Sequence, residues 1–280
     1  MSDPATSLPA VPLTLEGAFA LHQFFRFRWS AWRALPDSER GAIAAQAAAL
    51  FARLESSADS QIHTAFYSEL GHKGDLVLLH FRPSLEALNQ VELDLAHSPL
   101  YPFLELADSF VSVVEAGLYE STAKTYQAAL DQGFALHSPE WSAAVAQSLE
   151  RSAKALAPRL FPPIPAEKYL CFYPMSRFRG EQKNWYATSL ADRQRMMREH
   201  GAVGRRYAGQ VHQIITGSIG FDDWEWGVTL FAQNPVAFKK IVYEMRFDEV
   251  SSDYGLFGKF YIAIRLQASQ LASWLEGVLP

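Results

Sequence analysis

The chain has 280 residues, a formal net charge of −5 and 20% charged residues, a balance typical of a folded globular protein. An acidic chain does not suggest a nucleic-acid-binding protein, which usually carries a basic face. Because Cys171 is the only cysteine, an intrachain disulfide is excluded, which fits a reducing compartment. No stretch approaches the roughly 18 uninterrupted apolar residues of a membrane span, and the start lacks the pattern of a signal peptide. We therefore expect a cytoplasmic protein.

The N-terminal half alternates between strand and helix patterns. Phe25, Phe27 and Trp29 recur at period two within residues 15–32 and predict one buried strand face. The elements predicted after this strand are helices over 42–54 and 85–95 and strands over 62–70, 75–82 and 110–119. This order is that of a ferredoxin-like unit, which we place at residues 13–120. Residues 1–12 contain three prolines and are predicted to be extended or disordered.

The C-terminal half repeats the same order, which indicates a structural duplication. Strands are predicted over 169–175, 210–216, 224–231 and 257–266, and helices over 189–200, 235–246 and 267–277. Gly201 would end the first of these helices as a C-cap glycine. We therefore expect an α+β chain of two tandem ferredoxin-like units, the second at 167–280, joined by a helical linker at 121–166. Two such units can form a dimeric α/β barrel with helices outside, although the pattern alone does not establish barrel closure.

His200, at the predicted end of a helix, is a candidate metal ligand. A neutral imidazole commonly binds haem iron, and there the macrocycle supplies the other four ligands. The alternative is that His200 interacts with the C-terminus of its own helix, where a cationic side chain is favoured by about 0.3–1 kcal/mol. Position alone favours this alternative, and no other histidine lies at metal-site spacing from His200.

Two strands carry further candidates. Tyr173 and Met175 lie two residues apart and share a strand face, where Tyr173 is either an ordinary strand tyrosine or an oxidisable phenol beside a cofactor. Gln213 lies on a strand that could face a pocket, and a buried amide requires a polar partner. The alternative is that Gln213 is exposed, on a strand whose side chains alternate between the two faces of the sheet.

Arg246 stands out among the arginines of the second half because apolar residues flank it at a predicted helix end. Arginine is suited to bidentate recognition of carboxylates, so Arg246 is a candidate for binding an anionic ligand. The alternative is a salt bridge to a nearby carboxylate of the chain: Glu244, Asp248 or Glu249.

The segment from about residue 159 to 260 resembles the C-terminal domain of the coproheme decarboxylases, a family of the chlorite dismutase superfamily. The matching stretches are Tyr173–Ser176, Trp185–Tyr186, Met196–Met197, His200–Gly201, Gly204–Arg205, Gln213–Trp226 and Tyr243–Ser251. The N-terminal half resembles the family only in layout.

The resemblance implies a function and its partners. These enzymes use hydrogen peroxide to decarboxylate two of the four propionates of iron coproporphyrin III (coproheme) to vinyl groups, releasing haem b. Their subunits form a homopentamer, and a ferrochelatase that supplies coproheme is a possible transient partner.

The same resemblance assigns roles to individual residues. His200 would be the proximal iron ligand, Tyr173 would form the radical that abstracts hydrogen from a propionate side chain, and Gln213 would lie on the distal side. The remaining predicted coproheme-binding residues are Arg159, Met175, Ser176, Arg177, Trp185, Arg246 and Ser251. One of these positions departs from the family, which commonly has lysine where this chain has Arg177. The charge is kept, but arginine is effectively never neutral, so any proton-moving role of the lysine is in doubt.

Other functions on the same fold remain open. A chlorite dismutase would place an arginine on the distal side, where this chain has Gln213, and a dye-decolourising peroxidase would use a distal aspartate and arginine. A haem carrier or sensor would bind the cofactor without catalysis, and such a protein has no need of an oxidisable phenol at Tyr173.

Overall fold

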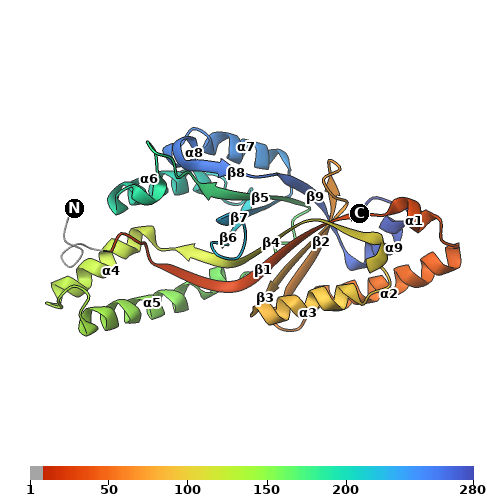
Figure 1. Cartoon of the computed structure of the whole chain (residues 1–280), viewed down its shortest axis with the longest axis horizontal. Helices are drawn as coiled ribbons and strands as arrows, with labels where there is room; N and C mark the ends of the chain where they lie inside the picture. The colour runs from red at the N-terminus through yellow and green to blue at the C-terminus, as the bar shows by residue number, and fades with distance from the viewer. Residues whose placement is uncertain (1–8) are drawn as a thin grey trace.

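In the computed structural model, residues 9–280 are described, and they fold around one antiparallel sheet (Figure 1). Its strands are β1 (Thr14–Phe27), β2 (His63–Leu70), β3 (Leu76–Arg82), β4 (Leu104–Gly117), β5 (Tyr169–Arg177), β6 (His212–Gly217), β7 (Trp226–Ala232), β8 (Gly255–Phe257) and β9 (Tyr261–Leu266). Residues 1–8, part of the predicted extended or disordered start, lie outside the described residues.

The sheet closes into a barrel. Its strand order is β7-β6-β4-β1-β3-β2-β9-β5-β8, and β5 also pairs with β7, which joins the two ends and leaves β8 outside the ring. The N-terminal unit contributes the order β4-β1-β3-β2 and the C-terminal unit the order β6-β7-β5-β9. The seams between the units are the β4–β6 and β2–β9 pairings. The predicted α+β fold of two ferredoxin-like units is therefore confirmed, and the barrel is closed.

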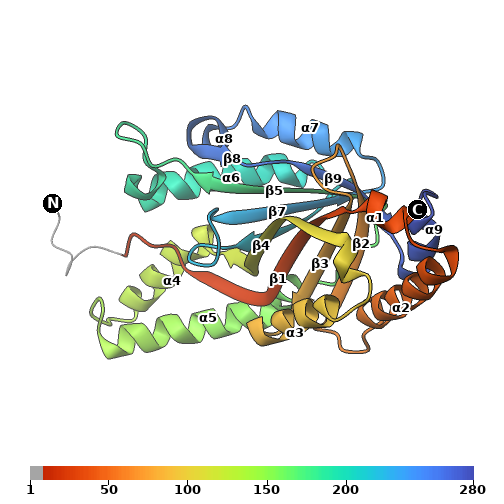
Figure 2. The same ribbon diagram turned by 45° about the vertical axis from the view of Figure 1, so that its right-hand side comes forward.

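Helices cover the outside of the barrel. They are α1 (Trp29–Arg33), α2 (Asp37–Glu55), α3 (Leu85–Ala96), α4 (Tyr119–Asp131), α5 (Pro139–Leu160), α6 (Leu190–Arg205), α7 (Val236–Met245), α8 (Glu249–Tyr254) and α9 (Leu271–Leu275). Figures 1 and 2 show α2 and α3 beside the strands of the first unit, and α6 and α7 beside those of the second. Within residues 9–280, no helix is long and apolar enough to cross a membrane.

Period-two alternation divides the apolar side chains between the barrel interior and the helix-covered faces. Phe24 and Phe172 lie in the interior cluster, where residues of both units meet. Phe25, one residue further along β1, packs instead in the cluster that contains α2 residues. In the same way Tyr173 lies in the cluster beneath α6 and α7, outside the barrel interior. The outer face of the second unit is therefore where the predicted site residues of β5 lie.

Three local predictions were wrong. Trp29 begins α1 and does not extend the first strand, although it still packs against the same aromatic cluster. The strand predicted over 110–119 is β4, which begins at Leu104 and ends at Gly117. Gly201 does not end its helix, because α6 continues to Arg205. The added turn carries Val203, which is buried in the cluster beneath α6 and α7.

The end of the chain also differs from its prediction. The strand expected over 257–266 is divided into β8 and β9, with β8 pairing only with the end of β5. The helix expected over 267–277 is a short 3₁₀ turn followed by α9. The linker predicted over 121–166 contains α5 and most of α4, while the exact unit boundaries stay a prediction.

Because α5 packs closely against the barrel, one methyl group added at Gly17 is predicted to lower the stability of the fold. A Cβ at Gly17 of β1 would lie 2.0 Å from the carbonyl oxygen of Leu160, so Gly17→Ala must shift the end of α5. We expect a loss of roughly 1–3 kcal/mol in the free energy of unfolding, the usual cost of overpacking. Urea denaturation measures this loss. Gly41→Ala is the matched control: Gly41 lies inside α2 with open space around it, so we expect a gain of about 0.5–1 kcal/mol. An unchanged stability of Gly17→Ala would contradict the close packing of α5.

Candidate functional site

A cavity of about 770 Å³ lies against the outer face of β5, β6 and β7 and the residues of α6 and α7. We call it the His200 cavity. Its volume is within the range of roughly 300–1,000 Å³ usual for sites that bind small molecules and cofactors. Most of the predicted site residues line it: Arg159, Tyr173, Met175, Arg177, His200, Gln213, Arg246 and Ser251. Segments far apart in the sequence are therefore brought to one cavity.

Two predicted residues do not line the His200 cavity. Ser176, the neighbour of Met175 on β5, is buried and accepts a hydrogen bond from the backbone N–H of Glu225 at 3.2 Å. Trp185 is almost fully buried, with its ring 4.9 Å from the guanidinium carbon of Arg177. Trp185 can therefore position Arg177, while its own contact with a ligand stays a prediction.

His200 is held by a carboxylate. Its Nδ1 lies 2.8 Å from Oδ2 of Asp248, the residue that caps the N-terminus of α8. Burial by itself raises the pKa of Asp248, but hydrogen bonds from His200 and Ser251 outweigh it and bring the pKa below its ordinary value. Asp248 is therefore ionised at neutral pH and accepts the Nδ1 proton, which leaves Nε2 of His200 as a free lone pair for a metal. The alternative that His200 interacts with its helix C-terminus is wrong, because α6 continues for another turn.

The strand register places the β5 and β6 candidates on one face of the sheet. Val228 of β7 pairs with Tyr173 on one side and with Ile215 on the other. Gln213, two residues before Ile215, pairs with Leu230 of β7. Cross-strand partners share a face, and so do residues two apart on one strand. Tyr173 and Gln213 therefore look into the same cavity from different strands.

The phenol of Tyr173 lies in apolar surroundings. The residue is 5% exposed and its ring stacks on Phe260 with centroids 4.4 Å apart. Burial raises its pKa well above that of an exposed tyrosine. Within the described part of the chain, its hydroxyl has no hydrogen-bond partner. Tyr173 is therefore a neutral phenol that carries its proton at any physiological pH.

Arg177 is a buried cation without an anion. It is 8% exposed, and its side-chain N–H groups reach the carbonyl of Val250 at 3.4 Å and the sulfur of Met197 at 3.7 Å. Across residues 9–280, no carboxylate forms an ion pair with it. Burial lowers the pKa of Arg177 from its high ordinary value, but an arginine remains charged. A buried guanidinium facing a cavity favours an anionic ligand.

Arg246 is also free of ion pairs in the part of the chain that the structure describes. The three carboxylates considered as partners are bound elsewhere: Glu244 to Arg206, Asp248 to His200 and Glu249 to Arg195. The salt-bridge alternative is therefore wrong. The guanidinium carbon of Arg246 lies 3.8 Å from the ring centroid of Phe257, so the aromatic ring holds the cation beside the cavity. Within the described residues, no acidic side chain pairs with its N–H donors.

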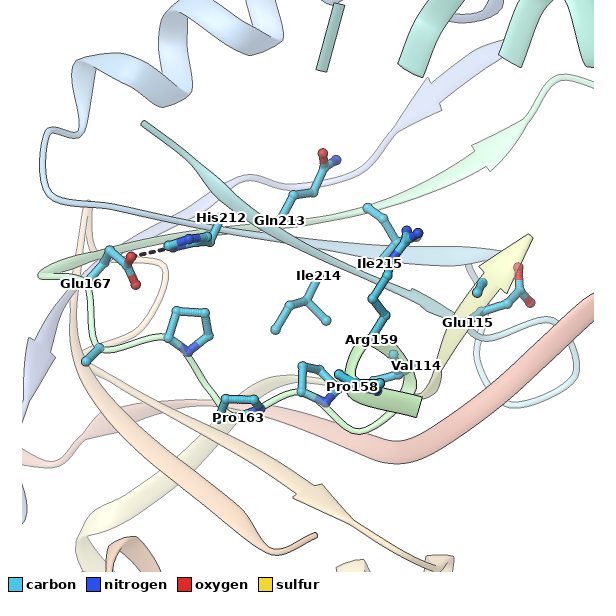
Figure 3. Close-up of a pocket in the computed structure, with 14 residues that line it drawn as sticks. Val114, Glu115, Pro158, Arg159, Pro163, Glu167, His212, Gln213, Ile214 and Ile215 are labelled. Carbon is cyan, nitrogen blue, oxygen red and sulfur yellow. Dashed lines mark hydrogen bonds and ion pairs between the residues drawn. The ribbon is translucent and has the colours of Figure 1, made fainter. Parts of the chain in front are cut away.

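A second cavity of about 490 Å³, the proline-lined pocket, adjoins the first. Figure 3 shows Arg159 extending from the end of α5 towards Ile215, with Gln213 projecting from the same side of β6. Both Arg159 and Gln213 line the two cavities, and Gln213 is exposed. The alternative reading of Gln213 as an exposed residue on an alternating strand is thus compatible with its facing a pocket.

Several residues of the site were not predicted from the sequence. Asp248 was considered only as a partner of Arg246, and its contact with His200 depends on how α6 and α8 pack. Glu115 and Tyr119 come from the N-terminal half and Trp226 from β7. The only signal for Glu115 and Tyr119 would have been the antiparallel pairing of β4 with β6, which the sequence pattern does not specify, whereas Trp226 already ends the matching stretch 213–226.

Comparisons with known proteins identify the family and the fold. The family model "Chlorite dismutase" matches residues 40–266. The coproheme decarboxylase of Staphylococcus saprophyticus is 40% identical over 259 residues, covering 91% of this chain and 94% of that protein. A Haloquadratum walsbyi protein, which is named provisionally as a heme-binding protein, is 41% identical over 95% of this chain. This chain spans 47% of that protein's length. The solved structure of a heme-binding protein from Thermus thermophilus has a TM-score of 0.81 at 38% identity, covering 96% of this chain and 99% of that chain.

The His200–Asp248 pair predicts how the site responds to an iron porphyrin. Asp248→Asn keeps an acceptor for the Nδ1 proton but removes the charge that makes His200 a stronger ligand. We expect the affinity for a ferric porphyrin to fall roughly 10- to 100-fold, the usual effect of losing such a partner. Affinity for the same porphyrin without iron should not change. Absorbance titrations of both porphyrins measure the difference.

Asp253→Asn serves as the control for this substitution. It removes the same charge from the same helix, but Asp253 pairs with Lys183 and does not line the cavity. An equal loss of affinity for the ferric and the iron-free porphyrin in Asp248→Asn would mean that Asp248 does not act through the iron ligand.

Proposed function

The chain belongs to the chlorite dismutase family, and we propose that it is a hydrogen-peroxide-dependent coproheme decarboxylase. It would convert two propionates of iron coproporphyrin III to vinyl groups and yield haem b. The observation that carries this proposal is the combination in one cavity of a carboxylate-bound histidine, arginines without ion pairs and a buried phenol. Cytoplasmic location, a homopentameric assembly and delivery of coproheme by a ferrochelatase belong to the same proposal through the family resemblance.

The charge of the cavity supports a substrate with several carboxylates. Four arginines line it: Arg159, Arg177, Arg205 and Arg246. Within residues 9–280, none of the four forms an ion pair with an acidic side chain. The whole chain nevertheless carries a net charge of −5, so this concentration of unpaired cations is local. Four propionates would equal the four arginines in number and carry the opposite charge. Each charge-assisted hydrogen bond contributes roughly 1.5–3 kcal/mol.

Each neighbouring residue has a role in this proposal. When bound, the iron porphyrin with peroxide supplies the oxidising equivalents, and its own propionates are the groups that react. His200, oriented by Asp248, would bind the iron. Tyr173, as a tyrosyl radical, would take a hydrogen atom from the carbon next to the porphyrin ring's reacting edge. Loss of carbon dioxide and of one further electron then leaves the vinyl group.

Gln213 distinguishes this proposal from chlorite decomposition. Its side chain is a neutral amide at the boundary of the two cavities, where a chlorite dismutase would have a cation to attract chlorite. An amide can hydrogen-bond peroxide without attracting an anion. The absence of charge on Gln213 therefore favours peroxide over chlorite as the oxidant.

A haem carrier or sensor is the second candidate function, favoured by the names of two similar proteins. Carriage requires the His200–Asp248 pair and the arginines, and it makes no use of Tyr173. The test therefore compares binding with turnover in a variant at that position.

Tyr173→Phe should bind ferric coproheme with unchanged affinity and lose decarboxylation. Removing the phenolic oxygen leaves the packing on Phe260 intact but removes the group that can be oxidised. We expect the rate to fall by at least about 100-fold, the scale on which a reacting group contributes. Chromatography with mass detection, during a peroxide titration, resolves the four-, three- and two-propionate porphyrins.

Tyr169→Phe is the matched control for this experiment. Tyr169 lies on β5 with the same side-chain direction as Tyr173, but it does not line the His200 cavity. It should keep full activity. If the wild-type protein binds coproheme tightly and only bleaches it with peroxide, the decarboxylase is excluded in favour of the carrier.

Arg246→Gln should weaken coproheme binding because one propionate loses its cation. We expect a decrease of about 10- to 150-fold, equivalent to the roughly 1.5–3 kcal/mol of a charge-assisted hydrogen bond. The decrease should vanish for the tetramethyl ester of coproheme, which carries no propionate charge. Arg198→Gln, an exposed arginine of α6 outside the cavity, is the control. Equal losses for the acid and the ester would show that Arg246 acts on the fold and not on a propionate.

A further inference from the structure

Glu115 is the one acidic side chain that lines the His200 cavity among residues 9–280. It lies near the end of β4, in company with the four arginines. A carboxylate at this place would repel the propionates of the proposed substrate and weaken their binding. Its presence in such a cavity therefore calls for a role that a neutral or cationic residue could not fill.

The carboxyl group of Glu115 is held in place by two neighbours. The indole Nε1 of Trp226 donates a hydrogen bond to Oε1 at 3.3 Å. Gly217 of β6 leaves the space that the other oxygen occupies, since a Cβ there would lie 2.5 Å from Oε2. Trp226 itself lines the cavity and pairs with Met175 of β5. The carboxyl group thus lines the same cavity as Tyr173, with β6 and β7 lying between their two strands.

Glu115 can exchange a proton with both the cavity and solvent. Burial raises its pKa, and the neighbouring charge of Glu16 on β1 raises it further, while the hydrogen bond from Trp226 opposes both. Arg159 of α5 and the phenol of Tyr119 also line the cavity around it. Figure 3 shows Glu115 at the opposite end of the proline-lined pocket from the Glu167–His212 pair. This second pocket connects Glu115 with the outer surface.

The proposed reaction needs a proton from the protein or solvent. Loss of carbon dioxide from one propionate to give a vinyl group releases two electrons and one proton. Reduction of one hydrogen peroxide to two waters takes two electrons and two protons. Each propionate therefore consumes one proton beyond the one it releases, and this proton must reach the peroxide oxygen inside the cavity.

Few groups in the cavity can give that proton. The arginines cannot, because a guanidinium does not deprotonate at physiological pH. Nδ1 of His200 is bound to Asp248, and Nε2 is assigned to the iron. Burial raises the pKa of the Tyr119 phenol, so it holds its proton more tightly than an exposed tyrosine. A carboxyl group shifted towards neutral pH is the remaining donor that solvent can recharge.

We propose that Glu115 supplies this proton. Arg177 stands where the family commonly has lysine, and it cannot take this role because a guanidinium does not release its proton. The proposal rests on the proposed decarboxylase function. Glu115→Gln keeps an oxygen that can accept the Trp226 hydrogen bond, so the cavity should keep its shape. Glu120→Gln is the matched control, because Glu120 is exposed at the start of α4 and lines neither cavity.

The first measurement is binding of iron-free coproporphyrin III as a function of pH. Without iron there is no turnover and no His200–iron bond, so neither contributes to the measured affinity. In the wild-type protein, affinity should fall as pH rises and Glu115 becomes charged against the propionates. Glu115→Gln should lack this fall. Trp226→Phe removes a hydrogen bond that stabilises the carboxylate, so the same fall should move to higher pH.

The second measurement is the decarboxylation rate with ferric coproheme and peroxide. The wild-type rate should fall as pH rises through the pKa of Glu115, while Glu115→Gln should be slower by about 100-fold at low pH and independent of pH over that range. Glu115→Asp should restore part of the rate. Tyr119→Phe should keep the wild-type pH profile.

The outcomes separate this proposal from the function on which it rests. If the wild-type protein decarboxylates coproheme and Glu115→Gln matches it in rate and pH profile, the proton donor is not Glu115 and the decarboxylase stands. A flattened profile in Tyr119→Phe would likewise overturn the role of Glu115 in favour of the phenol. An inactive wild-type protein would overturn both.

Discussion

The pairing of β5 with β7 is the constraint on which the rest of the structure depends. It closes the barrel, and it also sets which side chains face outward towards α6 and α7. In this register Phe172 fills the barrel interior while Tyr173 faces the His200 cavity. Because strand side chains alternate, a slip of one residue would exchange the two. The site is therefore as well defined as the barrel itself, since the alternative register would move the phenol of Tyr173 into the apolar barrel interior and Phe172 out of it.

The cavity concentrates charge that the protein alone does not neutralise. Arg177 is buried with a carbonyl and a sulfur as its neighbours, and Arg246 lies over an aromatic ring. Leaving the buried cation of Arg177 without an anion costs stability, whereas a ligand carboxylate would remove that cost on binding. His200, the histidine assigned to a metal, differs from these arginines because it has an acidic partner, Asp248, which orients it. Ligand affinity and fold stability are thus coupled in this cavity.

The sequence predicted the fold and most cavity-lining residues because those depend on local pattern and on a specific resemblance. Period-two alternation placed Tyr173 and Met175 on one face, and the matching stretches pointed to His200 and Arg246. Contacts between elements distant in the chain were not accessible in this way. Asp248 reaches His200 only because α8 packs beside α6, and Gly201 was taken for a helix end because the buried position of Val203 could not be seen in the pattern.

The two halves of the duplication contribute unequally to the cavity. The C-terminal unit supplies the histidine, the phenol and most of the arginines. The N-terminal unit supplies Glu115 across the β4–β6 seam, where only two residue pairs join the strands. Arginines suit the recognition of carboxylates, but a guanidinium does not release its proton at neutral pH. The N-terminal half, which the family model matches from residue 40 and which therefore resembles the family in sequence as well as in layout, thus brings to the cavity the one acidic side chain that lines it within the described residues.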